Sequence, residues 1–66
     1  MAVLKVIEVL ASSDKSWEDA TQKAVDQAAK SLKHIRSVYV QEQSAIVKEG
    51  KIVEYRVNLK LSFEIE

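Results

Sequence analysis

The sequence predicts an α+β protein with the element order β-α-β-β. Three observations indicate this class: a β-branched stretch at residues 2–11, apolar residues at helical spacing from residue 16 to about residue 33, and strict alternation of apolar and polar residues over 52–66. These elements fill the chain, so we expect a single domain over residues 1–66. A short turn separates the last two strands, which favours a three-stranded antiparallel sheet with the helix on one face.

The first predicted strand is apolar on both of its faces. Its apolar members are Val3, Ile7 and Val9 on one side and Leu4, Val6 and Leu10 on the other. This pattern is typical of a strand that is buried on both sides. Because one helix covers one side, we expect a second subunit to cover the other.

The predicted helix has a start signal and an apolar stripe. Residues 12–14 end the first strand, and the acidic residues of Ser16-Trp17-Glu18-Asp19 suit the positive end of a helix dipole. The stripe consists of Trp17, Ala20, Ala24, Ala28, Leu32 and Ile35. We interpret Trp17 as a core or interface anchor rather than a ligand-stacking ring. We interpret His34 as a cap of the helix C-terminus or a surface residue rather than a catalytic base.

The second predicted strand spans residues 36–47, and Lys48-Glu49-Gly50-Lys51 joins it to the third. On an ideal strand, one face carries Val38, Val40, Glu42, Ser44 and Ile46, and the other carries Ser37, Tyr39, Gln41 and Gln43.

The third predicted strand is too long for a compact chain of this size. A strand of about 14 residues spans roughly 48 Å at about 3.4 Å per residue. A compact globule of this length has a radius of gyration near 11 Å and a diameter of about 28 Å by the usual scaling. We therefore expect the strand to curl around the helix, to project into a neighbouring subunit, or to do both.

The composition excludes several classes of function. The net charge is +0, from 10 basic and 10 acidic residues, which removes the electrostatic basis of strong nucleic-acid binding. No stretch is long and apolar enough to span a membrane, and the lack of cysteine fits the cytoplasm. The chain has no cysteine nucleophile, glycine-rich phosphate loop or serine elbow motif, so we expect no enzymatic activity. Oligomerisation remains as the means of stabilising so small a domain.

Polar side chains on the second and third strands form a candidate binding surface. Its members are Gln41, Gln43, Arg56 and Asn58. They offer hydrogen bonds to a planar polar ligand, although a solvated sheet face has the same composition. The candidate acidic ligands of a metal ion such as Ca²⁺ are Glu42, Glu54, Glu64 and Glu66. These carboxylates could converge only across subunits.

The chain resembles the dodecins over essentially its whole length. The matching segments are Lys5-Val6-Ile7-Glu8, Ser12-Ser13, Ser16-Trp17-Glu18-Asp19-Ala20, Val38-Tyr39-Val40-Gln41-Glu42-Gln43, Tyr55-Arg56-Val57 and Ser62-Phe63-Glu64. The resemblance implies a subunit whose three-stranded antiparallel sheet wraps around one helix. It also implies a hollow homododecamer of cubic symmetry. Such a shell would cover the second face of the first strand and receive the long last strand.

The resemblance further implies a flavin site between subunits, where dodecins store or sequester flavins such as riboflavin and FMN. Ser37 occupies the position of the tryptophan that stacks on the flavin, and Arg56 that of the glutamine that recognises its ring. Glu42 matches an acidic residue near the flavin, with Gln43 beside it. This match implies that Glu42 lies on the face of Arg56, and a β-bulge near Gln41–Gln43 would place it there. Because Ser37 and Arg56 depart from the pattern, we expect flavin binding to be weakened or lost.

Three further segments are similar to a flavin-free, calcium-binding branch of the dodecins: Ser16-Trp17-Glu18, Ile35-Arg36 and Tyr55-Arg56. We therefore expect a non-enzymatic shell of identical subunits that binds and stores a small molecule or an ion, with Ca²⁺ as a candidate. Two alternatives stay open. One is a flavin-storage dodecin that retains riboflavin or FMN binding, and the other is a purely structural or interaction oligomer.

Overall fold

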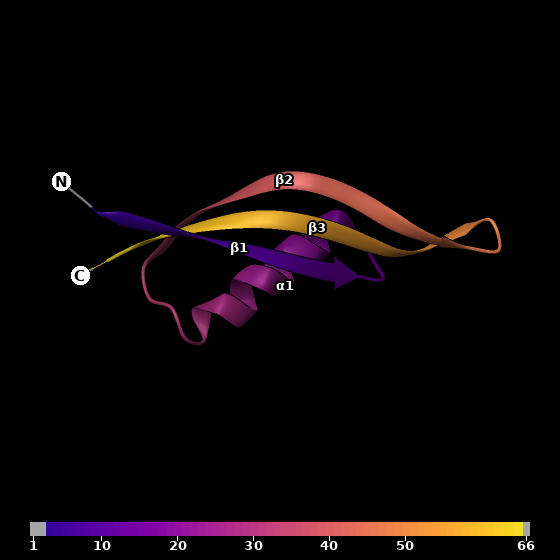
Figure 1. The fold of residues 1–66 in the computed structure, drawn as a ribbon. Helices are drawn as coiled ribbons and strands as arrows, with labels where there is room; N and C mark the ends of the chain where they lie inside the picture. Colours follow the sequence, from indigo (N-terminus) through magenta and orange to yellow (C-terminus); the bar gives the residue numbers. More distant parts are fainter. Residues whose placement is uncertain (1–2, 66) are drawn as a thin grey trace.

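The computed structural model describes residues 3–65 and has the predicted β-α-β-β order. The elements are β1 (Leu4–Ser13), α1 (Trp17–Ala29), β2 (Ile35–Lys48) and β3 (Lys51–Glu64). The three strands form one antiparallel sheet in the order β1-β3-β2, and α1 lies against one face of it (Figure 1). The predicted fold class is therefore confirmed, and the third strand in sequence is the central strand of the sheet.

Helix α1 begins where the sequence predicts and ends earlier. The backbone N–H of Asp19 donates to Oγ of the N-cap Ser16 over 2.9 Å. The helix ends at Ala29, short of the predicted residue 33, because the next turn tightens and the N–H groups of Ser31 and Leu32 both donate to the Ala28 carbonyl. His34 therefore lies in the loop beyond the helix, at φ 62, and is exposed, whereas Lys30 is the C-cap. The expected surface position of His34 is confirmed, and its expected place at the helix terminus is not.

The core lies between α1 and the central strand and is small. Its buried apolar side chains are Ala20, Ala24, Val57, Leu59 and Leu61. Val9, Ala11 and Trp17 pack around this cluster and are partly buried. The two alanines allow the helix to approach the sheet closely, as the apolar stripe predicts.

The pairing of β2 with β3 contains the bulge that the sequence allows for. Val40 pairs with Leu59 and Glu42 with Asn58, so the register shifts at Gln41. Beyond the shift, Glu42 and Ser44 join the face opposite the helix, and Gln43 moves to the other face, beside Val57. The face assignment expected for an ideal strand is thus wrong from Gln41 onward.

The hairpin of β2 and β3 projects well beyond the helix (Figure 1). The molecule measures 50 × 20 × 13 Å and has a radius of gyration of 13.5 Å, against about 11 Å for a compact chain of this length. The projecting hairpin confirms that the last strand is too long for its own domain.

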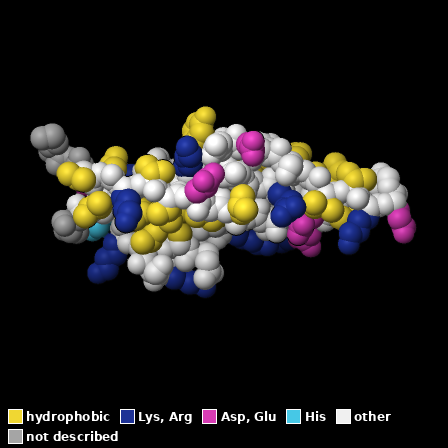
Figure 2. Space-filling view, in the orientation of Figure 1, with side chains coloured by type: hydrophobic (Ala, Val, Ile, Leu, Met, Phe, Trp, Pro, Cys, Tyr) yellow, Lys and Arg dark blue, Asp and Glu magenta, His cyan; other side chains and the backbone are white. Residues whose placement is uncertain are grey.

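The sheet face opposite the helix, which we call the open face, exposes large apolar side chains. On β1 these are Leu4 (50% exposed), Val6 (56%) and Leu10 (74%), which are the members of the predicted second apolar face. Hydrophobic side chains remain visible along the length of the molecule, between charged ones (Figure 2). Within the described part of the chain, no helix has the length and hydropathy to cross a membrane.

Candidate functional site

The strand register places six side chains in two parallel rows on the open face. Residues that pair across adjacent strands lie on the same face of a sheet. The first row, which we call the donor row, consists of Ser12, Arg56 and Ser44. The second row consists of Leu10, Asn58 and Glu42, and we call it the acceptor row after the side-chain oxygens of Asn58 and Glu42. Each row takes one residue from β1, one from β3 and one from β2. The bulge at Gln41 completes both rows, because it places Glu42 and Ser44 on this face.

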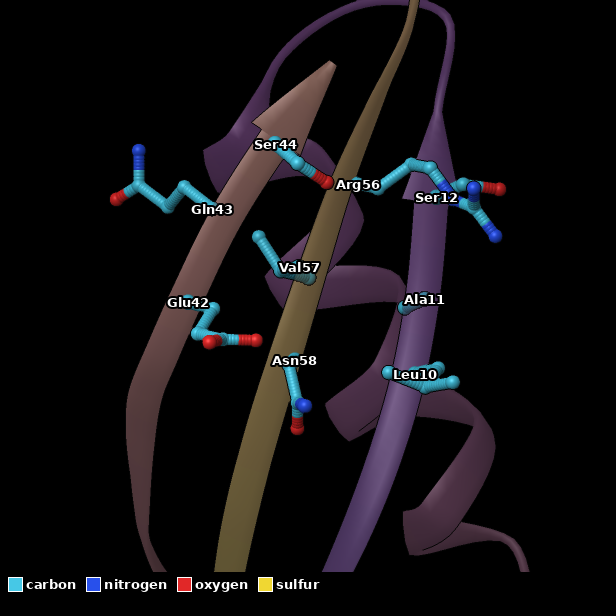
Figure 3. Close-up of a pocket in the computed structure, with 9 residues that line it drawn as sticks. All are labelled: Leu10, Ala11, Ser12, Glu42, Gln43, Ser44, Arg56, Val57 and Asn58. Atoms are coloured by element: carbon cyan, nitrogen blue, oxygen red, sulfur yellow. The ribbon is translucent and has the colours of Figure 1, made fainter. Parts of the chain in front are cut away.

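The two rows line a hollow of about 600 Å³, together with the neighbouring segments at Ala11, Gln43 and Val57. Arg56 extends over β1 toward Ser12, whereas the carboxylate of Glu42 and the amide of Asn58 lie at the other end of the hollow (Figure 3). Positive and negative groups thus occupy different ends of one cavity.

Several polar groups of this hollow have no partner among residues 3–65. Neither Arg56 nor Glu42 forms an ion pair or a side-chain hydrogen bond with another described residue. The amide oxygen of Asn58 is buried and accepts no hydrogen bond from a described group. A buried acceptor without a donor costs about 1–3 kcal/mol, so a turn of the Asn58 side chain that exposes this oxygen to a donor in the hollow is favoured.

Trp17, the first residue of α1, contacts the strands β2 and β3 on the face of the sheet behind the site. The indole N–H of Trp17 donates to the Ser44 carbonyl over 2.9 Å. The Trp17 ring meets Tyr55 edge to face, with centroids 4.9 Å apart and planes at 76°. These contacts fix β2 and β3 to α1 beside the donor row and agree with the interpretation of Trp17 as an anchor.

A second polar cluster ties β1 to α1 on the helix side of the sheet. The buried Ser13 hydroxyl donates to Asp19 Oδ2 over 2.5 Å and accepts from the Lys15 N–H over 2.9 Å. Lys23 Nζ lies 3.2 Å from the same carboxylate oxygen of Asp19. The hydrogen bond from Ser13 and then the contact with Lys23 lower the pKa of Asp19 below its ordinary value.

The structure brings together part of the predicted flavin-type site. Glu42 and Arg56 both line the hollow, whereas the side chain of Gln43 points away from it (Figure 3). Ser37 is on the open face but outside the hollow, where its hydroxyl hydrogen-bonds that of Ser62.

The acidic candidates do not converge within the described chain. Glu54 and Glu64 both belong to β3, ten residues apart, which corresponds to about 34 Å of extended strand. Glu64 forms an ion pair with Arg36, and Glu66 lies outside the described residues. No group of three or more acidic or histidine side chains that could hold a metal ion is present in residues 3–65.

Sequence reasoning missed three residues of the site, namely Leu10, Ser12 and Ser44. The sequence indicates only an apolar strand face for Leu10 and the end of a strand for Ser12. The order of the strands was the missing signal, because only a central β3 places β1 and β2 on either side of Arg56.

The fold and the site define a β-α-β-β protein with a three-stranded antiparallel sheet and a polar hollow on the open face of that sheet. The family model described as Dodecin matches residues 3–66. Calcium dodecin from Mycobacterium tuberculosis is 38% identical over 65 residues, which cover 98% of this chain and 92% of that protein. Dodecin from Thermus thermophilus is 33% identical over 64 residues, covering 97% and 93%. The chain belongs to the dodecin family.

Solved structures of dodecins also resemble this chain in fold. A mutant of the Thermus thermophilus dodecin superposes with a TM-score of 0.94 at 32% identity and covers 100% of this chain and 98% of that one. Calcium dodecin from Mycobacterium tuberculosis, described as calcium-chelating with a novel calcium-binding site, gives a TM-score of 0.84 at 41% identity, covering 98% and 93%.

Proposed function

We propose that this chain is the subunit of a dodecin-type shell, a homododecamer that binds and stores a small molecule or ion without catalysing a reaction. The hollow on the open face carries the proposal, because its charged and polar groups lack partners among residues 3–65. The exposed apolar side chains of β1 and the projecting hairpin offer surfaces on which identical copies can pack. We place the shell in the cytoplasm, which suits a chain without cysteine.

Ca²⁺ is the first candidate ligand. Its support is the name of the Mycobacterium tuberculosis relative, calcium dodecin. Ca²⁺ takes six to eight oxygen ligands, more than one carboxylate supplies. We therefore propose that carboxylates of several copies contribute, and the candidates are Glu42, Glu54, Glu64 and Glu66.

A flavin is the second candidate, and the size of the hollow favours it. About 600 Å³ lies within the usual range of small-molecule sites, which is roughly 300–1,000 Å³. Its stacking surface is weakened, however, because Ser37 offers a hydroxyl where the family pattern has an aromatic ring. We propose that riboflavin and FMN bind more weakly than to dodecins with that ring, through Glu42 and Arg56, which line the hollow, with Ser37 and Gln43 beside it.

Two measurements test this function. Light scattering of the purified protein should give a mass of about twelve chains of 7.4 kDa. Calorimetric titration of the metal-free protein with Ca²⁺, and fluorescence titration with riboflavin and FMN, should detect saturable binding of the ion and weak or absent binding of the flavins. A monomer that binds none of these probes would contradict the proposal.

A further inference from the structure

We propose that the donor row, Ser12, Arg56 and Ser44, is a subsite for an oxyanion, which is a carboxylate or a phosphate. This inference deepens the proposed function, on which it rests, because it assigns a ligand chemistry to the hollow. The donor row crosses the sheet on the open face, with Arg56 on the central strand and one hydroxyl on each neighbour.

The charge of Arg56 is the first argument. A guanidinium stays protonated and presents N–H donors in a planar fork that matches carboxylate and phosphate oxygens. Among residues 3–65, no carboxylate lies within ion-pair distance of Arg56. Glu42, which also lines the hollow, is in the acceptor row, and Arg56 extends away from it toward Ser12 (Figure 3). The guanidinium is therefore available to a ligand in the hollow.

The two hydroxyls are the second argument. Adjacent strands are about 4.8 Å apart, so Ser12 and Ser44 lie one strand away from Arg56 on its two sides. The guanidinium lies on the Ser12 side (Figure 3), so Arg56 and Ser12 are placed to hold one oxyanion together. Neither hydroxyl forms a side-chain hydrogen bond with another described residue. A hydroxyl can donate to an anion as readily as it accepts from water, so Ser12 can donate to the oxyanion that Arg56 holds. Ser44 can donate to the same group when the flexible Arg56 side chain turns back over β3.

The acceptor row constrains the rest of the ligand. The exposed carboxylate of Glu42 requires a donor, and the amide oxygen of Asn58 accepts one when its side chain turns toward the hollow. Leu10 is 74% exposed beside them. The two rows are two residues apart along each strand, which corresponds to a distance of about 7 Å between them. The ligand therefore carries an oxyanion at one end, a hydrogen-bond donor about 7 Å away and an apolar edge. A bare divalent cation satisfies the oxygens of Asn58 and Glu42 but leaves the charge of Arg56 unmet.

The test uses the purified, assembled protein and two simple anions, inorganic phosphate and acetate, as probes in calorimetric titrations at low ionic strength. We expect saturable binding of at least one, and the stronger of the two identifies the source of the oxyanion. Arg56→Gln should weaken that binding at least tenfold. The matched control is Lys60→Gln, which removes one positive charge from the same face of β3 outside the hollow, and it should change the affinity less than twofold.

A double variant, Ser12→Ala with Ser44→Ala, tests the hydroxyls and should weaken binding by threefold or more while leaving the assembly intact. Equal losses in Arg56→Gln and Lys60→Gln would show that general surface charge binds the anion and would overturn the inference. If the protein assembles and binds Ca²⁺ or a flavin but neither anion, the oxyanion subsite is wrong and the proposed function stands. If it neither assembles nor binds any probe, the proposed function itself fails.

Discussion

At the scale of single residues, the Asp19 cluster makes the junction of β1 and α1 sensitive to acid. Ser13 and Lys23 lower the pKa of Asp19, so its ionised form is favoured by folding. The stabilisation is complete above the ordinary carboxyl pKa of about 4 and is lost as the pH falls through the lower pKa of the folded state.

Ser13→Ala should therefore raise the pKa of Asp19 toward its ordinary value and move the midpoint of acid unfolding to higher pH. Carbon-detected NMR titration of the carboxyl group measures the first effect, and circular dichroism measures the second. The control is Ser12→Ala, one residue away on the opposite face of β1, which should leave the pKa of Asp19 unchanged. The same shift in both variants would mean that Ser13 does not act through its hydrogen bond.

Ser37 is the residue at which flavin binding should respond to a single substitution. Ser37→Trp adds an aromatic surface on the open face, and such a ring contributes about 0.5–1.5 kcal/mol beyond its buried area. We expect riboflavin to bind several-fold to tenfold more tightly, and the double variant with Arg56→Gln to bind more tightly than either single variant. Fluorescence quenching measures the affinity.

The control for this substitution is Ser31→Trp, which adds the same side chain beyond the end of α1 and should leave riboflavin binding unchanged. Tight binding by the unsubstituted protein would contradict the expectation for Ser37, because another group would then provide the stacking surface.

At the scale of elements, the sequence predicts those features of the fold that depend on a periodic pattern of apolar residues. The alternation of β3 and the alanine stripe of α1 are periodic, and both are confirmed. The bulge at Gln41 has no periodic signal of its own, and it decides whether Glu42 and Gln43 face the hollow. Two of the four predicted ligand-binding residues, Glu42 and Gln43, therefore depend on a register shift. The sequence could allow for this shift but could not locate it by pattern alone.

The turn between β2 and β3 contains a residue, Glu49, that is unfavourable for its backbone conformation. Glu49 has φ 52 and Gly50 has φ 78, and two positive φ angles in a two-residue hairpin turn favour Asn-Gly. Glu49→Asn should stabilise the protein by about 0.5–1 kcal/mol, because asparagine tolerates the left-handed region better than glutamate. Gly50→Ala should destabilise it by about 1 kcal/mol through backbone strain, since a Cβ there meets no atom within 4 Å.

Urea unfolding measures both changes in the free energy of unfolding. Lys48→Asn is the control, because it places an asparagine in the last residue of β2, outside the turn, and should not stabilise. A loss of stability in Glu49→Asn would show that the glutamate side chain makes a contact in the assembly that outweighs its backbone conformation.

At the scale of the whole molecule, the single chain exposes more surface than a compact monomer of its mass would. It exposes 5065 Å², whereas about 4,200 Å² is expected of a compact monomer of 7.4 kDa. Among residues 3–65, five apolar residues are buried, but eleven large hydrophobic residues are exposed. A core this small rarely supplies more than about 3–5 kcal/mol, so folding and assembly should be coupled.

Val6→Lys tests this coupling, because Val6 lies on the open face of β1, where the second subunit is expected. Burying an unpaired ammonium in an apolar interface costs several kcal/mol per copy, so the assembly should dissociate at micromolar subunit concentration. The released chains should also unfold, since they lose the surface that supplements their core. Gln22→Lys is the matched control: it adds the same charge at an exposed position of α1 and should leave the mass unchanged. Light scattering gives the mass and circular dichroism the folded fraction of each protein at equal concentration. If Val6→Lys yields a folded monomer with cooperative unfolding, then the chain is stable alone, and the exposed apolar face of β1 needs another explanation than self-assembly.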